Sequence, residues 1–256
     1  MNLPARTGWH WLKAGFGLFR MQPGILMMFV FTNFMMSLLL SALPFIGAPL
    51  AVLLIPVFSM ATLEGCRQID AGRKVNFDVL LTGFRPPMVR QLCKLGVVYL
   101  VLSVAVTLLM RGMIDRSFFE QFADANPDNP VRMADADLMA LLLILALQAM
   151  VLLLLAFAAP LIYWQKMLPG KATFYSVFAV LRAKGAFLTL LMCWAGLFLA
   201  IALVATAIFG NGSGGRVVIV WLMLLFVLLL QCGLYAAYRQ IFGVPDELAK
   251  PDLIKR

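Results

Sequence analysis

Long apolar segments alternate with short polar ones along the chain. One uncharged run covers residues 138–164 and contains 27 residues, LMALLLILALQAMVLLLLAFAAPLIYW. An α-helix rises about 1.5 Å per residue, so this run reaches roughly 40 Å, more than the ~30 Å hydrocarbon core of a bilayer requires. One amide, Gln148, stands near its middle, and Pro160 stands near its far end. The run predicts a transmembrane helix with a single deep polar side chain.

Five further segments have the length and composition of transmembrane helices. Together they predict an all-α, polytopic membrane protein with one integral membrane domain over residues 1–256. Pro56, near the middle of the second span, removes a backbone donor and is expected to kink that helix unless neighbouring groups compensate. The six predicted spans cover approximately residues 24–43, 48–63, 95–114, 138–163, 186–209 and 217–238.

Residues 5–20, ahead of the first span, have a different pattern. Apolar residues recur there at helical spacing, and a basic residue recurs every seventh position: Trp9, Leu12, Phe16 and Phe19 on one face, and Arg6, Lys13 and Arg20 between them. The pattern predicts an amphipathic helix that lies in the membrane interface and anchors the first span. A short amphipathic helix, capped by Asn76, is expected at residues 77–84 on the cytoplasmic side.

The basic residues predict the orientation of the chain in the membrane. All but four of the 21 Lys and Arg residues lie on the side that holds both termini, and the exceptions are Arg111, Arg116, Arg132 and Arg216. The positive-inside rule therefore places both termini in the cytoplasm, together with the basic connections at 64–94 and 165–185. Orientation accounts for the net charge of +9, so no nucleic-acid partner is expected.

Composition agrees with the membrane assignment. The chain is 63% hydrophobic and 13% charged, whereas soluble proteins average about 25% charged residues. The cysteines at 66, 93, 193 and 232 have no metal-ligand spacing, and the lone His10 has no second histidine or carboxylate one turn away. We expect no metal and no cofactor.

Three amides are the polar side chains expected at depth: Asn33, Gln148 and Gln231. The simplest interpretation is that each hydrogen-bonds a neighbouring helix, and the alternative is that they converge and line a polar site for an amphiphile. No predicted span carries an ionisable residue in its central part, which argues against proton coupling and intramembrane acid–base catalysis. Candidate contacts to anionic lipid headgroups are Arg67, Arg73, Lys74, Lys171 and Arg182.

Short motifs spread over most of the chain carry a family resemblance: Gly15, Phe19, Arg20 and Pro23, then Gly47 and Pro56, then Pro160, Pro169, Ala172, Ser176 and Ala179, and finally Tyr238, Arg239 and Phe242. With these the chain resembles an uncharacterised family of proteobacterial six-helix inner-membrane proteins, and more distantly the membrane segments beside some glycerophosphodiester phosphodiesterases. The resemblance implies a bacterial inner-membrane location and no established activity. The chain has no phosphodiesterase barrel to receive that enzyme's catalytic residues.

These observations favour a non-enzymatic protein that acts as a scaffold or accessory subunit in the bacterial inner membrane. Its partners would be the lipid bilayer and a membrane protein or a second copy. The alternative is a transporter or channel for a lipid or small amphiphile. An enzyme is the third hypothesis, and it would need a site built from the basic cytoplasmic connections.

Overall fold

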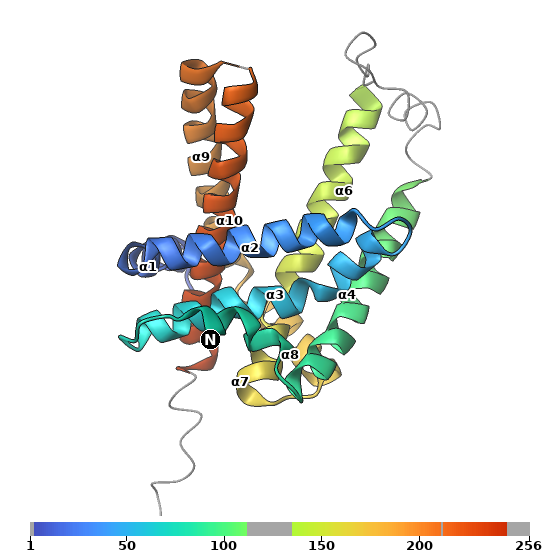
Figure 1. Ribbon diagram of the computed structural model, residues 1–256, viewed down its shortest axis with the longest axis vertical. Helices are drawn as coiled ribbons and strands as arrows, with labels where there is room; N and C mark the ends of the chain where they lie inside the picture. Colours follow the sequence, from blue (N-terminus) through green and yellow to red (C-terminus); the bar gives the residue numbers. More distant parts are fainter. Residues whose placement is uncertain (1–2, 112–134, 211, 245–256) are drawn as a thin grey trace, which may run out of the picture.

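The computed structural model describes residues 3–111, 135–210 and 212–244, and all of its regular elements within these ranges are helical (Figure 1). Residues 112–134, which include the end of the third predicted span and most of the connection after it, lie outside the described residues. In chain order the elements are α1 (Thr7–Met21), α2 (Pro23–Ser41), α3 (Gly47–Asp70), η1 (Phe77–Phe84), α4 (Met88–Arg111), α6 (Asp135–Leu154), α7 (Ala158–Gln165), α8 (Pro169–Arg182), α9 (Lys184–Phe209) and α10 (Ser213–Phe242).

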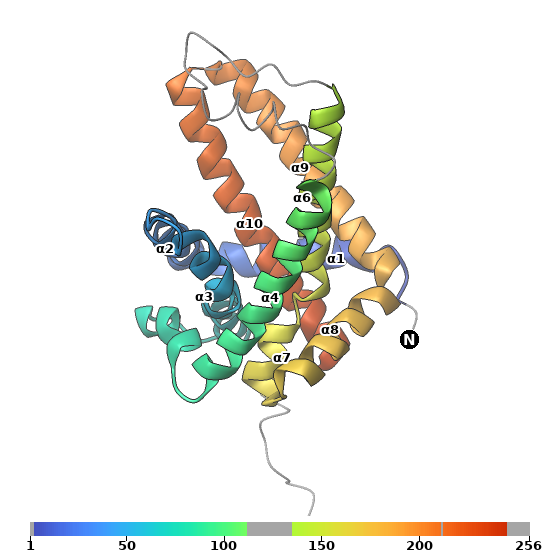
Figure 2. The same cartoon turned by 90° about the vertical axis from the view of Figure 1, so that its right-hand side faces the viewer.

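Six helices are long and apolar enough to cross a membrane, which confirms the predicted fold class. Four of these segments run along the long axis of the molecule and form the α4–α6 and α9–α10 pairs (Figure 1). The other two, α2 and α3, pack on each other and run across that axis, and Figure 2 shows them nearly end-on. The six helices are therefore not a parallel bundle.

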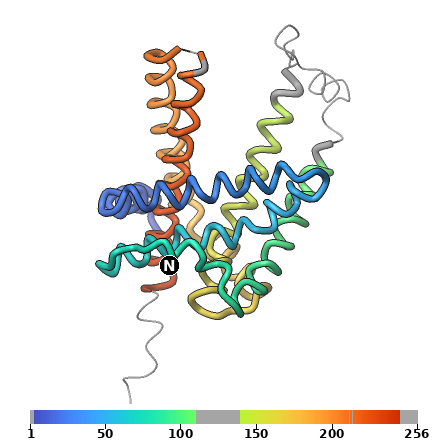
Figure 3. Tube along the Cα trace, viewed as in Figure 1, coloured from blue at the N-terminus to red at the C-terminus, as the bar shows by residue number. Residues whose placement is uncertain are grey.

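Helix α1 packs more closely against the other helices than a helix that only anchors a span in the membrane interface would. It packs against α9 and α10, beside whose orange traces its dark blue trace is seen nearly end-on in Figure 3, and its Trp11 is only 2% exposed. Two glycines allow this approach, because a Cβ at Gly8 would lie 2.1 Å from the carbonyl oxygen of Ala186 and one at Gly15 would lie 2.6 Å from the backbone nitrogen of Gly233. Trp11 Nε1 also donates to Gln240 Oε1 at 2.6 Å.

The helix of the second predicted span continues beyond the end of that span. Helix α3 runs without a break through Pro56 to Asp70, seven residues past the predicted end at residue 63. Glu64, which we expected in a polar connection, is 5% exposed within the helix. The apolar pattern weakens after residue 63 because the last two turns of α3 bury Glu64 together with the apolar Cys66 and Ile69.

The fourth span is interrupted near Pro160. Helix α6 ends at Leu154 and α7 begins at Ala158, although one apolar segment covers both. A proline has no N–H to donate and its ring collides with the carbonyl four residues earlier, here that of Ala156, so Pro160 weakens the helix at this point. The single helix predicted over 138–163 is thus two helices.

The short helices have exposed apolar faces. η1 is a 3₁₀ helix with Phe77 63% exposed, and α8 leaves Phe174 67% exposed. Exposed apolar faces beside membrane helices are typical of interfacial elements. The expected cap at η1 is absent, because the Asn76 side chain makes no capping hydrogen bond.

Candidate functional site

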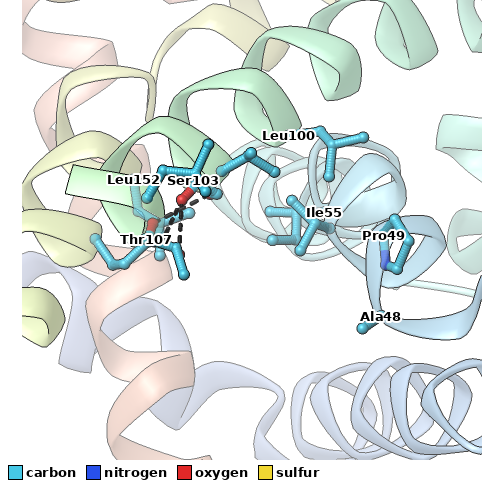
Figure 4. Close-up of a pocket in the computed structure, with 11 residues that line it drawn as sticks. Ala48, Pro49, Ile55, Leu100, Ser103, Thr107 and Leu152 are labelled. Carbon is cyan, nitrogen blue, oxygen red and sulfur yellow. Dashed lines mark hydrogen bonds between the residues drawn. The ribbon is translucent and has the colours of Figure 1, made fainter. Parts of the chain in front are cut away.

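A cavity of about 530 Å³ lies between α3, α4 and α6 (Figure 4). Its walls are mostly aliphatic, and its polar groups come from Ser103, Thr107 and Gln148. The residues that line it are Ala48, Pro49, Val52, Ile55, Leu100, Ser103, Val104, Thr107, Leu108, Gln148 and Leu152. Its size and its few polar groups are within the range of small-molecule pockets.

Gln148 faces this cavity but is already hydrogen-bonded to α4. Its Oε1 accepts from Ser103 Oγ at 3.1 Å, and its Nε2 donates to the Ser103 carbonyl at 3.2 Å. Thr107 Oγ1 donates to the same carbonyl at 2.9 Å. The amide therefore joins α6 to α4 and also contributes a polar edge to the cavity.

The structure does not bring the other two amides to this cavity. Asn33 Nδ2 donates to the Phe58 carbonyl at 3.1 Å and so joins α2 to α3. Gln231, on α10, has a buried Oε1 that accepts no hydrogen bond from the described residues. Each amide lies against a different part of the fold, so a polar site lined by all three is not formed.

The α6–α7 break is stabilised by side chains from two other helices. Ser176 Oγ, on α8, donates to the Leu154 carbonyl at 2.7 Å and accepts from the Phe157 N–H at 3.1 Å. Tyr99 Oη, on α4, donates to the Leu155 carbonyl at 3.0 Å. Interrupted backbone within a membrane helix requires such partners because lipid offers none. These hydrogen bonds satisfy the backbone groups that the break leaves free, and they stabilise it as part of the fold.

A second polar group of residues lies at the end of α3. Glu64 accepts from Arg67 Nε at 2.9 Å, from Trp164 Nε1 at 2.9 Å and from Gln68 Nε2 at 3.3 Å. Six residues further along α3, Asp70 accepts from Tyr235 Oη at 3.0 Å and pairs with Arg239 of α10. We call these residues the helix-end network: Glu64, Arg67, Gln68, Asp70, Trp164, Tyr235 and Arg239.

The candidate headgroup residues fall into two groups. Arg67 belongs to the helix-end network, and its side chain is 18% exposed beside Glu64. Arg73, Lys74, Lys171 and Arg182 are exposed. Lys171 Nζ lies 5.8 Å from the ring centroid of Tyr175, next to the exposed aromatic face of α8. Four of the five candidate cations are thus exposed on the surface of the protein.

The buried polar residues at the end of α3 have partners within the fold. The helix-end network pairs its acids with bases and hydrogen-bond donors, which satisfies the buried charges. Among the residues that the structure describes, no group of three His, Cys, Asp or Glu side chains is placed to hold a metal ion.

The fold and the apolar helix surfaces define a polytopic α-helical membrane protein. The chain is 32% identical over 257 residues to a protein of Burkholderia thailandensis that is named a probable inner membrane protein, and the alignment covers 96% of this chain and 94% of that relative. The chain therefore belongs to the same family of bacterial inner-membrane proteins. No family model matches it, and no solved structure matches it.

Sequence reasoning did not identify Ser176, Tyr99 and Glu64 as structurally important. Ser176 lies in the basic connection predicted over 165–185, and only the position of α8 beside the α6–α7 break gives its hydroxyl a role. The signal for Glu64 was its single turn of separation from Arg67 on one helix, which is the spacing of an ion pair. The role of Tyr99 could not be predicted, because a single tyrosine in an apolar span does not indicate which group its hydroxyl will bind.

Proposed function

We propose that the protein is a non-enzymatic scaffold or accessory subunit, and that α9 is the helix that binds its partner. The observation that carries the proposal is an outward face of α9 that no other described helix covers. It contains small residues at a spacing suited to close helix packing, Gly196 and Ala200.

Helix α9 is the least buried of the six candidate spans, with 11% of its most apolar window buried. A Cβ at Gly196 would meet no atom within 4 Å, which differs from Gly8 and Gly15 of α1, where glycine allows contact inside the chain. The same helical face continues through exposed residues at Met192, Leu199, Leu203 and Ala207. The opposite face, with Trp194 and Phe198, packs toward Phe226 of α10.

Small residues matter at membrane interfaces because lipid provides no hydrophobic driving force between helices. Association then depends on close van der Waals contact, which glycine and alanine permit. A face with this spacing that is unused inside the chain fits a second helix, either from another membrane protein or from a second copy.

The test is copurification of the full-length chain from native membranes extracted in a mild detergent. Gly196→Leu places a bulky side chain on the α9 face, and Ala105→Leu is the matched control because Ala105 is an exposed small residue on another apolar helix, α4. We expect a partner in a fixed ratio with the wild type and the control, and its loss with Gly196→Leu.

Two differently tagged copies in one cell distinguish self-association from a different partner. Recovery of the isolated protein alone, under conditions that preserve known membrane complexes, would contradict the proposal. Equal recovery of a partner with Gly196→Leu and with wild type would show that α9 is not the binding helix.

The cavity beside Gln148 favours a second candidate, a transporter or channel for a lipid or small amphiphile. The supporting observation is an aliphatic cavity with one polar edge near the middle of a predicted span. Leu152→Trp fills this cavity, whereas Leu145→Trp adds the same ring at an exposed position of α6 outside the cavity lining. Transport or flipping of a fluorescent phospholipid in vesicles should fall with the first change alone, and no transport by the wild type would exclude this candidate.

The cytoplasmic position of both termini and the headgroup contacts of Arg73, Lys74, Lys171 and Arg182 belong to the same proposal. The charge distribution along the chain supports the orientation. The resemblance to membrane segments beside phosphodiesterases adds no residue with a catalytic role.

A further inference from the structure

A second cavity, of about 380 Å³, lies where α1 crosses the α9–α10 pair. We call it the α1 groove. Its lining is apolar or aromatic except for one cation, and it consists of Trp9, Leu12, Lys13, Phe16, Trp194, Leu197, Ile201, Leu225, Phe226 and Leu229. Three of the wall residues, Trp9, Leu197 and Ile201, are 39–45% exposed, so the groove is open along its side.

The charged and apolar parts of the α1 groove lie at opposite ends. Helix α1 contacts α9 at Ala186 and Leu190, which is within about 9 Å of the start of α9 at a rise of 1.5 Å per residue. The wall residues Trp194, Leu197 and Ile201 lie further along α9, toward its apolar middle. A phospholipid has the same polarity, with a charged headgroup at the interface and chains directed to the membrane centre.

Lys13 gives the groove its charge preference. It is exposed on α1, and its Nζ lies 5.3 Å from the ring centroid of Trp9 at the groove wall. Arg6, just before the helix, and Arg20, on its exposed side, stand seven residues from Lys13 in either direction, and the helix contains no acid. This row of cations favours an anionic group over a neutral one.

The aromatic wall of the groove is fixed before any ligand binds. Trp194 Nε1 donates to the Phe226 carbonyl at 2.6 Å, and the rings of Phe198 and Phe226 lie 5.3 Å apart. A wall that is already ordered lowers the entropy cost of binding.

We propose that the α1 groove is a binding site for an anionic phospholipid, with the phosphate at Lys13 and an acyl chain between α9 and α10. The site uses the side of α9 that packs toward α10, and it does not depend on the partner proposed for the outward face. The established description of the family as inner-membrane proteins assigns no such site.

The test is native mass spectrometry of the delipidated full-length protein titrated with phosphatidylglycerol or phosphatidylcholine. We expect tighter binding of phosphatidylglycerol to the wild type. Lys13→Ala should weaken that binding about fivefold, which corresponds to about 1 kcal/mol for one basic residue near an anionic surface. Lys13→Arg should retain it, and Lys94→Ala, which removes an exposed lysine on α4, should leave it unchanged.

Two further variants test the apolar part of the site. Leu197→Trp should reduce phosphatidylglycerol binding at least tenfold by filling the groove, and Ile201→Trp fills the same groove from further along α9 in case the first variant does not fold. Equal binding of the two lipids to the wild type would overturn the proposal. Equal losses of phosphatidylglycerol binding with Lys13→Ala and Lys94→Ala would also overturn it. So would full phosphatidylglycerol binding by a folded variant in which tryptophan fills the groove.

Discussion

The contact of α1 with α10 gives a sharp prediction, because two glycines on the same helix have opposite surroundings. A Cβ at Gly15 would lie 2.6 Å from the Gly233 nitrogen and 2.9 Å from the Cys232 carbonyl carbon, both of which are backbone atoms. A Cβ at Gly17 would meet no atom within 4 Å. Gly15→Ala therefore forces two helices apart, whereas Gly17→Ala changes only the helix itself.

The two effects have known sizes. Replacing glycine by alanine in a helix gains about 0.5–1 kcal/mol, because alanine loses less backbone entropy on folding. Adding a methyl group to a tightly packed contact costs about 1–3 kcal/mol. We expect Gly17→Ala to stabilise the protein by about 0.5–1 kcal/mol and Gly15→Ala to be about 1–3 kcal/mol less stable than Gly17→Ala.

Reversible unfolding in mixed micelles measures both free energies, and Trp11 fluorescence reports whether α1 leaves its site. Trp11 is 2% exposed, so detachment of α1 would move its indole to a more polar environment. If the two alanine variants have the same stability within about 0.5 kcal/mol, α1 does not pack on α10 through Gly15. That result would refute the contact between α1 and α10.

Three other changes probe the buried polar groups by the same unfolding assay. Glu64→Gln removes the charge that faces Arg67 and should cost about 3 kcal/mol, and a wild-type stability would show that the pair contributes nothing. Tyr235→Phe removes a hydrogen bond to the Asp70 carboxylate and should cost about 1.5 kcal/mol, with Asp70 still paired to α10, so a loss above 4 kcal/mol would contradict this geometry. Gln231→Leu removes a buried acceptor without a donor and should stabilise the protein by about 1 kcal/mol, whereas destabilisation would indicate a partner for that amide.

The three deep amides show which properties of a buried polar residue a sequence pattern can predict. Their identity and approximate depth were predictable, because polar residues stand out in apolar runs. Their partners were not, since Asn33 bonds a backbone carbonyl of α3 and Gln148 bonds Ser103 of α4, and neither pairing has a signal in local spacing. Both amides hydrogen-bond a neighbouring helix, and the cavity beside Gln148 adds a feature that only the structure shows.

The glycines of α1 show a similar limit of sequence patterns in the N-terminal segment. Its amphipathic pattern predicted an interfacial helix from the aromatic and basic residues. The structure shows that the small residues on the other side, Gly8 and Gly15, place the helix against α9 and α10. A small residue carries little information in a hydropathy pattern, although it decides how closely two helices approach.

The sequence alone determined the class of protein, the six apolar segments and the presence of an amphipathic N-terminal helix. These properties depend on the length and polarity of local segments, because the bilayer imposes the same requirement on every span. The tertiary structure decided the crossing of α2 and α3 over the other helices, the break before Pro160 with its partners Tyr99 and Ser176, and the two cavities. Each of these depends on contacts between residues far apart in the chain, and such contacts arise only when the helices pack together.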